Sequence, residues 1–228
     1  MKILLTIAVL VAANAGGVAR NSDFVLSRRV SHFGIEKTST LNALIWLGRD
    51  EHICFGIEFY GGLRNAVQIQ MDDATVGEIV QKILGSSGDY QLSVSDGVIL
   101  IRKRGVKSAD WLNHRLPHFK VPKGELMFVN SQLWMALETD LDPSKQGFGG
   151  DYPPTDPIDV VGPFDERGQT VRQLLVRIAA ASRGATWYPT QGTEVPAPGS
   201  INSFWTLVTY GGNPGTTLDD ATGEVLQP

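Results

Sequence analysis

One pattern of apolar and polar positions occurs twice in the chain, at residues 75–83 and again at residues 170–178. Both segments read T-V-x-[EQ]-[IL]-[VL]-x-[KR]-I. A Thr whose hydroxyl can cap a helix is followed three residues later by Glu78 or Gln173, whose side chain can reach back to the N–H of the cap. The apolar residues behind each Thr recur at intervals of three and four and form one helical stripe. The pattern therefore predicts two capped amphipathic helices and a duplicated module.

Segments with strand patterns lie on both sides of the first copy. Residues 67–71 alternate between apolar and polar side chains, which is the pattern of a half-buried strand. Residues 90–94 and 98–101 enclose Asp96 and Gly97, and a Gly at this position is typical of a tight hairpin turn. We therefore predict a strand before the first capped helix and a hairpin after it.

The segment upstream of these elements adds a helix and further strands. Ser39 can cap a helix whose apolar residues begin at Leu41. The apolar run of residues 53–60 predicts a strand, and residues 33–35 suggest one more. The predicted fold class is α+β, with two small modules. Each is a short mixed or antiparallel sheet packed with two helices in a βαββαββ-like order.

The second half of the chain repeats this order less clearly. His118-Phe119 echoes the earlier His-Phe pair, and Ser131 is aligned with the capping Ser of the first half, with a slip of one residue. Residues 158–161 occupy the place of the alternating strand. Residues 187–188 and 204–208 would form the closing hairpin, with the Gly- and Pro-rich loops 143–157 and 190–203 inserted between elements.

The N-terminal segment predicts export. Lys2 precedes an apolar run at residues 3–13, and Ala15 or Ala19 could mark the cleavage site of a secretory signal peptide. A membrane-spanning helix needs about 20 apolar residues, so this run is short for that role. We expect a periplasmic or secreted protein with no transmembrane segment after cleavage. The predicted divisions are a signal peptide at 1–19, a first module at 30–104, a basic connector at 105–117, a second module at 118–210 and a disordered tail at 211–228.

Composition narrows the partner classes. The net charge of −4 gives no reason to expect a nucleic-acid partner.

The single Cys, Cys54, cannot form an internal disulfide and is expected to be a buried apolar residue. His52 lies two residues away, and on a strand it would share a face with this thiol.

The elements around the first capped helix resemble the short N-terminal domain shared by secretins and TonB-dependent receptors (the STN domain). The resemblance rests on the strand 67–71, the Thr75-Val76 helix opening, Tyr90 and the segment 97–101. It covers roughly residues 41–104 and is weaker in the second half. It implies a small periplasmic domain that docks protein partners and has no catalytic residues. No secretin pore region or outer-membrane barrel pattern follows in the sequence.

Four groups of residues could carry chemistry, and each has a plainer explanation. His114 and His118 have a spacing suited to a metal on a helix, but Pro117 argues against that helix. Asp72 and Asp73 could pair as catalytic acids, or could simply favour the start of the next helix. Five acids near the first long loop could bind calcium, although their spacing does not fit the known twelve-residue loop, and they are Asp140, Asp142, Asp151, Asp156 and Asp159. Four Trp could offer stacking surfaces or belong to the core: Trp111, Trp134, Trp187 and Trp205.

We therefore predict a non-enzymatic interaction protein without catalytic, cofactor or metal residues, which binds an envelope protein. The alternative is a secreted carbohydrate-binding or hydrolytic protein that uses the Trp residues and the acidic loop. Exposed edges of sheets accept partner strands, and the long loops and the basic connector are the expected contact regions. The candidate contact residues are Phe148, Tyr152, Asp151, Asp156, Trp205, Arg102 and Arg104.

Overall fold

The computed structural model describes residues 24–59, 63, 65–85, 88–141, 143 and 159–191, together with three strands, 203–208, 217–218 and 225–226. Residues 1–23, which include the predicted signal peptide, lie outside this set, as does most of both long loops. The α+β class is confirmed, because the chain contains both helices and strands and the strands form small sheets with antiparallel and mixed pairing. No described helix is long and apolar enough to span a bilayer.

The first half has the order strand, helix, two strands, helix, two strands. The elements are β1 (Arg29–Ser39), α2 (Thr40–Glu51), β2 (Cys54–Ile57), β3 (Ala66–Thr75), α3 (Val76–Leu84), β4 (Tyr90–Ser95) and β5 (Val98–Lys103). Ser39 caps α2 by accepting from the Asn42 N–H. Thr75 and Glu78 form the predicted capping box of α3. β1 is longer than the predicted strand 33–35 and pairs antiparallel with β3.

The second half follows the same order with some differences. Its elements are the short 3-10 helix η1 (Asp110–Asn113), β6 (Arg115–Val121), β7 (Gly124–Glu125), α4 (Leu126–Leu141), β8 (Val160–Val161), β9 (Phe164–Thr170), α5 (Val171–Ala180), β10 (Thr186–Gln191) and β11 (Ser203–Val208). Thr170 and Gln173 form the second capping box. β6 begins three residues before the expected start of the second module at His118. In the tail, β12 (Thr217–Leu218) pairs with β13 (Val225–Leu226).

Three expectations about local structure were wrong. Ser131 lies inside α4, where its hydroxyl donates to the Phe128 carbonyl, and so it does not cap a helix. The strand that pairs with β6 is β9, not residues 158–161, and β8 pairs only with β7. His52 does not share a strand with Cys54, because it ends α2 in the left-handed conformation with φ 52°.

The two halves share one central sheet. Its five strands have the order β11-β10-β2-β5-β4, so that the hairpin of the second half continues the sheet of the first. β10 runs parallel to β2, and Thr186 and Trp187 are paired with Phe55 and Gly56. The sequence predicts a separate sheet for each half, whereas the two halves share this one.

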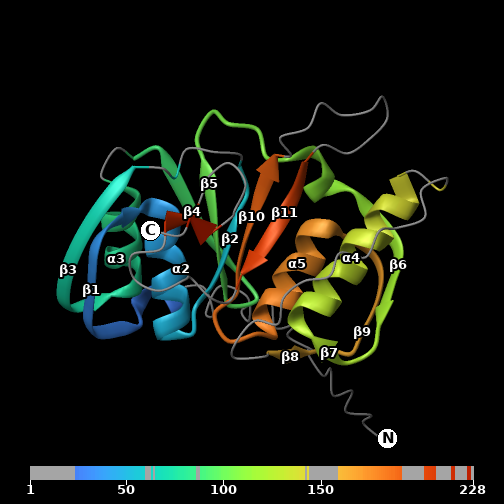
Figure 1. Ribbon diagram of the computed structural model, residues 1–228, viewed down its shortest axis with the longest axis horizontal. Helices are drawn as coiled ribbons and strands as arrows, with labels where there is room; N and C mark the ends of the chain where they lie inside the picture. Colours follow the sequence, from blue (N-terminus) through green and yellow to red (C-terminus); the bar gives the residue numbers. More distant parts are fainter. Residues whose placement is uncertain are drawn as a thin grey trace, which may run out of the picture.

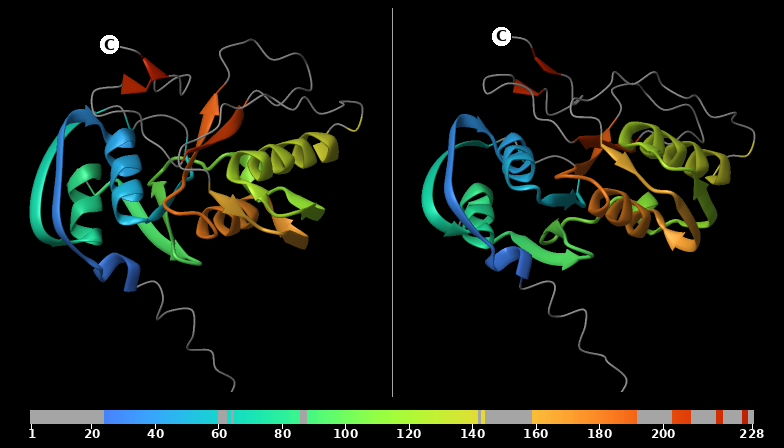
Figure 2. Two further views of the ribbon diagram at one scale, coloured as in Figure 1. Left: turned by 60° about the horizontal axis from the view of Figure 1, so that its bottom comes forward. Right: turned by 90° about the horizontal axis from the view of Figure 1, so that it is seen from below.

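The shared sheet divides the interior into two cores. Phe55, Ile99 and Ile101 face the core that contains α2 and α3. Cys54, Leu100 and Trp187 face the core that contains α4 and α5. Figures 1 and 2 show the resulting order of layers: the β1–β3 pair, α2 and α3, the central sheet, α4 and α5, and the β6–β9 pair. The same helix-and-strand arrangement thus covers both faces of one sheet.

Candidate binding groove at a sheet edge

β4 forms one edge of the central sheet, and its hydrogen-bonding groups can be assigned from the register. In an antiparallel pair, residues that exchange both hydrogen bonds alternate with residues whose N–H and C=O point away. The Arg104 N–H donates to the Asp89 carbonyl at 2.7 Å, which makes these two residues a hydrogen-bonded pair. Counting along the register, Tyr90, Leu92 and Val94 direct their N–H and C=O groups away from β5. We call this side of β4 the β4 edge.

No strand in the described part of the chain pairs with the β4 edge. Natural sheets often protect such edges with charged side chains, Pro or bulges. The sequence of β4, Tyr-Gln-Leu-Ser-Val-Ser, contains no charge, Pro or Gly, and the register with β5 is regular. Within the described part of the chain, the β4 edge therefore presents unpaired backbone donors and acceptors.

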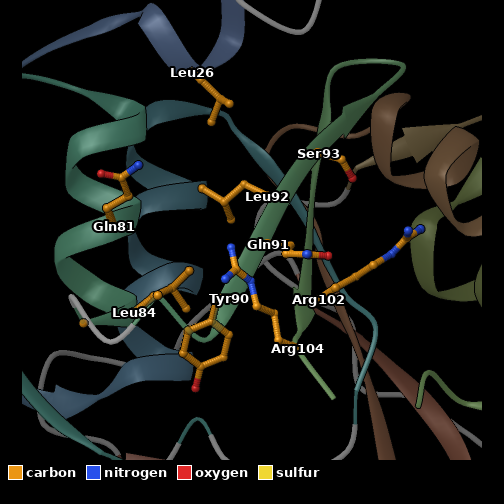
Figure 3. Close-up of a pocket in the computed structure, with 11 residues that line it drawn as sticks. Leu26, Gln81, Leu84, Tyr90, Gln91, Leu92, Ser93, Arg102 and Arg104 are labelled. Atoms are coloured by element: carbon orange, nitrogen blue, oxygen red, sulfur yellow. The ribbon is translucent and has the colours of Figure 1, made fainter. Parts of the chain in front are cut away.

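A groove of about 750 Å³ lies beside this edge, between β4 and the end of α3. We call it the edge groove. Its lining is Leu26, Gln81, Leu84, Gly85, Gly88, Tyr90, Gln91, Leu92, Ser93, Arg102 and Arg104. Figure 3 shows Leu84, Tyr90 and Leu92 on the side of α3, where they give the groove an apolar wall. Tyr90 also packs against Phe59, with ring centroids 5.8 Å apart, and partial burial raises the pKa of its hydroxyl.

The groove is basic. Its lining includes two Arg side chains and no acid. Arg104 is exposed, and within the described residues its side chain makes no ion pair. Figure 3 shows Arg104 reaching along β4, whereas Arg102 points away from α3. The predicted contact residues Arg102 and Arg104 thus line one groove, which no pattern in the sequence predicts.

Arg102 has a second partner in a buried ion cluster. Glu58 follows β2 and its side chain is 0% exposed. Arg102 donates to it through Nε at 2.7 Å and through a terminal nitrogen at 3.2 Å, and this hydrogen bonding raises the pKa of Arg102. Arg172 of α5 donates through Nε to Oε1 of this carboxylate at 2.8 Å, the oxygen that also accepts from the terminal nitrogen of Arg102. Glu58 therefore joins a strand of the first half to a helix of the second.

The other predicted contact residues are placed less completely. Phe148, Asp151, Tyr152 and Asp156 lie outside the described residues. Trp205 lies on β11, where its backbone pairs with Pro189, and only the backbone of β11 is described.

Each of the two histidines considered for metal binding pairs with one acid. Of the acids considered for calcium, Asp140 is such a partner, Asp159 accepts from the Arg183 N–H at 2.8 Å, and the remaining three lie outside the described residues, namely Asp142, Asp151 and Asp156. His114 Nε2 is 2.6 Å from Asp140 Oδ2, and His118 Nε2 is 2.6 Å from Asp165 Oδ1. The hydrogen bond from His118 lowers the pKa of Asp165. Among the described residues, no three His, Cys, Asp or Glu side chains are grouped in a way that could hold a metal ion.

The remaining candidates for chemistry have structural partners. Asp72 is hydrogen-bonded to Nδ1 of His32, and Asp73 forms an ion pair with Arg29. Cys54 is buried, and desolvation raises the pKa of its thiol, which disfavours a reactive thiolate. Trp111 and Trp187 are buried in the core around α4 and α5, and Trp134 packs against it.

Comparison with protein-family models, with curated protein sequences and with solved structures gave no match.

Proposed function

We propose that this chain is a non-enzymatic protein of the cell envelope that docks another protein at the edge groove. The observation that supports this proposal best is the β4 edge, because it joins unpaired backbone groups to a partly apolar, basic groove. Sheet edges of this kind recognise extended segments of other proteins through main-chain hydrogen bonds, with neighbouring pockets for side chains.

Two further observations agree with a docking role. The first half has the element order predicted from its sequence pattern, and that sequence resembles the STN domain of secretins and TonB-dependent receptors, which docks protein partners. The two acids considered as a catalytic pair have separate partners, Asp72 with His32 and Asp73 with Arg29. The apolar N-terminal run is the basis for placing the protein outside the cytoplasm.

Site-specific photo-crosslinking in the producing cells tests this role. A photoreactive residue at Gln91, which is exposed and lines the groove, should give one discrete cross-linked protein. The same residue at Lys123, which is exposed in the second half, is the matched control and should not give it. The product should disappear when Arg104→Glu is added. Equal products at both positions, or a product indifferent to Arg104→Glu, would argue against docking at the groove.

A further inference from the structure

The strand equivalent to β4 in the second half is already paired with a further strand. β10 follows the capped helix α5 as β4 follows the capped helix α3, and each is the first strand of a hairpin. The Phe55 N–H donates to the Ala185 carbonyl at 3.1 Å, so Ala185, and by alternation Trp187, face β2. The edge of β10 that corresponds to the β4 edge is therefore paired with β2, and the two strands run parallel.

Tyr90 and Trp187 occupy corresponding positions in the two hairpins. Each directs its side chain toward the helices of its own half and its backbone groups away from the second strand of its hairpin. Trp187 is 0% exposed, and Gly56 of the added strand lies directly against its ring. Tyr90 is only half-buried and lines the edge groove. The second half thus shows how an added strand covers this position.

From this correspondence we propose that the edge groove binds an extended segment of a partner protein as a sixth strand of the central sheet, parallel to β4. This inference rests on the proposed docking function and specifies its geometry. The N–H and C=O groups of Tyr90, Leu92 and Val94 pair with the segment, as those of β10 pair with β2. Alternate side chains of the segment are apolar and pack on Leu84, Tyr90 and Leu92.

Charge defines the segment further. Arg104 lies beside the start of β4, because its N–H bonds to Asp89 and it follows the partner of Tyr90 in the register. It has no acidic partner among the described residues, whereas Arg102 forms an ion pair with Glu58. A carboxylate of the partner segment can pair with the guanidinium of Arg104. Because the segment runs parallel to β4, its acidic residue lies near the N-terminal end of the segment.

A peptide library tests both features with the whole mature chain as bait. The probe is a phage-displayed library of random eight-residue segments held in flexible linkers. Enriched sequences should alternate apolar and polar residues and carry Asp or Glu toward the N-terminal end. Selection on Arg104→Ala should lose the acidic preference and keep the alternation, and Lys123→Ala, the matched control, should change neither. Enriched sequences without alternation would overturn the proposal.

N-methylation of one enriched peptide then tests strand addition without altering the protein. Only every second N–H group of an added strand faces β4. N-methylation at these positions of the peptide should weaken binding by about tenfold or more, and N-methylation at the positions between them should weaken it little. A spin label at the N-terminus of the peptide should broaden the amide signal of Tyr90 more than that of Ser95. Equal losses of affinity for both alternating sets of positions would rule out strand addition. Broadening that is strongest at Ser95 would overturn the parallel direction.

Failure of this inference can be distinguished from failure of the docking role. If the groove cross-links a partner through Gln91 but no library peptide binds, the partner docks in another form and the strand is wrong. If neither experiment gives a product, both proposals fall. If Gln91 cross-links to Gln91 of a second copy and the chain sediments as a dimer, the occupant is this chain itself and the partner segment is wrong.

Discussion

Among the described residues, the same hairpin edge is paired with a further strand in one half of the molecule and unpaired in the other. β10 pairs with β2 and buries Trp187, whereas β4 has no described neighbour beyond β5 and leaves Tyr90 half-exposed. In the second half this edge joins the halves into one sheet, and in the first half no described strand pairs with it.

The largest expected effect contrasts the two aromatic positions. Trp187→Ala should lower the free energy of unfolding by about 3–5 kcal/mol, because it removes a fully buried ring from the core. Tyr90→Ala should lower it by only about 1 kcal/mol, since the ring is half-buried beside the groove. Urea unfolding of both variants measures the difference. Equal losses would mean that Tyr90 is covered in the full chain.

The buried ion cluster should matter next, because it also joins the halves. Arg172→Ala removes a charged hydrogen bond to the fully buried Glu58 and should cost about 1.5–3 kcal/mol. Arg177 lies on the same helix and pairs with Glu166, but its side chain is 43% exposed. Arg177→Ala is therefore the matched control and should cost less than about 1 kcal/mol. Similar losses of the free energy of unfolding for both variants in urea would show that the buried Glu58 cluster stabilises the fold no more than an exposed ion pair.

A single methyl group tests the contact between β2 and β10. A Cβ at Gly56 would lie 2.5 Å from Cζ2 of Trp187, so Gly56→Ala should cost about 1–3 kcal/mol through overpacking. At Gly34 the added Cβ would meet only the side chain of His32 at 3.1 Å, and this side chain is 59% exposed. Gly34→Ala should change stability by about 0.5 kcal/mol or less. Thermal unfolding that shifts equally for both would contradict the close packing at β10.

The smallest effect distinguishes the two capping boxes by pH. The Thr75 N–H and hydroxyl donate to Glu78 at 2.7 and 2.8 Å, which lowers the pKa of Glu78 below its ordinary 4.5. A lowered pKa in the folded state gives stability that is present above pH 4.5 and is lost as the pH falls through the folded value. Gln173 does not titrate. Glu78→Gln should therefore make the unfolding midpoint depend less steeply on pH between pH 5 and 3, roughly the range of carboxyl titration. A pH dependence of the midpoint equal to that of the unchanged protein would contradict this assignment.

Most elements could be predicted because their signals are local. The capping boxes, the Asp96-Gly97 hairpin and the alternation of β3 each depend on a few neighbouring residues. β9 escaped prediction because its sequence, Phe-Asp-Glu-Arg-Gly-Gln-Thr, is polar and has no buried face of its own. The start of α4 was misplaced because its helix was aligned on Ser131. The match of His118-Phe119 to His32-Phe33 gives the correct start, since α2 and α4 begin at equal spacing after these pairs.

The site could be predicted only in part. The basic residues Arg102 and Arg104 were expected to contact a partner, and an edge was expected to accept a strand. Which edge this is depends on the parallel pairing of β10 with β2, between residues more than a hundred positions apart, and no local pattern records it. Glu58 was missed for the same reason, since a single acid in an apolar segment gives no sign of two Arg partners.

Amide hydrogen exchange of the full chain, read residue by residue by NMR, tests the comparison most directly. If the β4 edge is uncovered, the amides of Leu92 and Val94 should exchange much faster than those of Gln91 and Ser93, which bond to β5. The amide of Trp187, which faces β2, should be as protected as those two. Protection of Leu92 and Val94 equal to that of Gln91 and Ser93 would show that another segment covers the edge, and would contradict the proposed docking site.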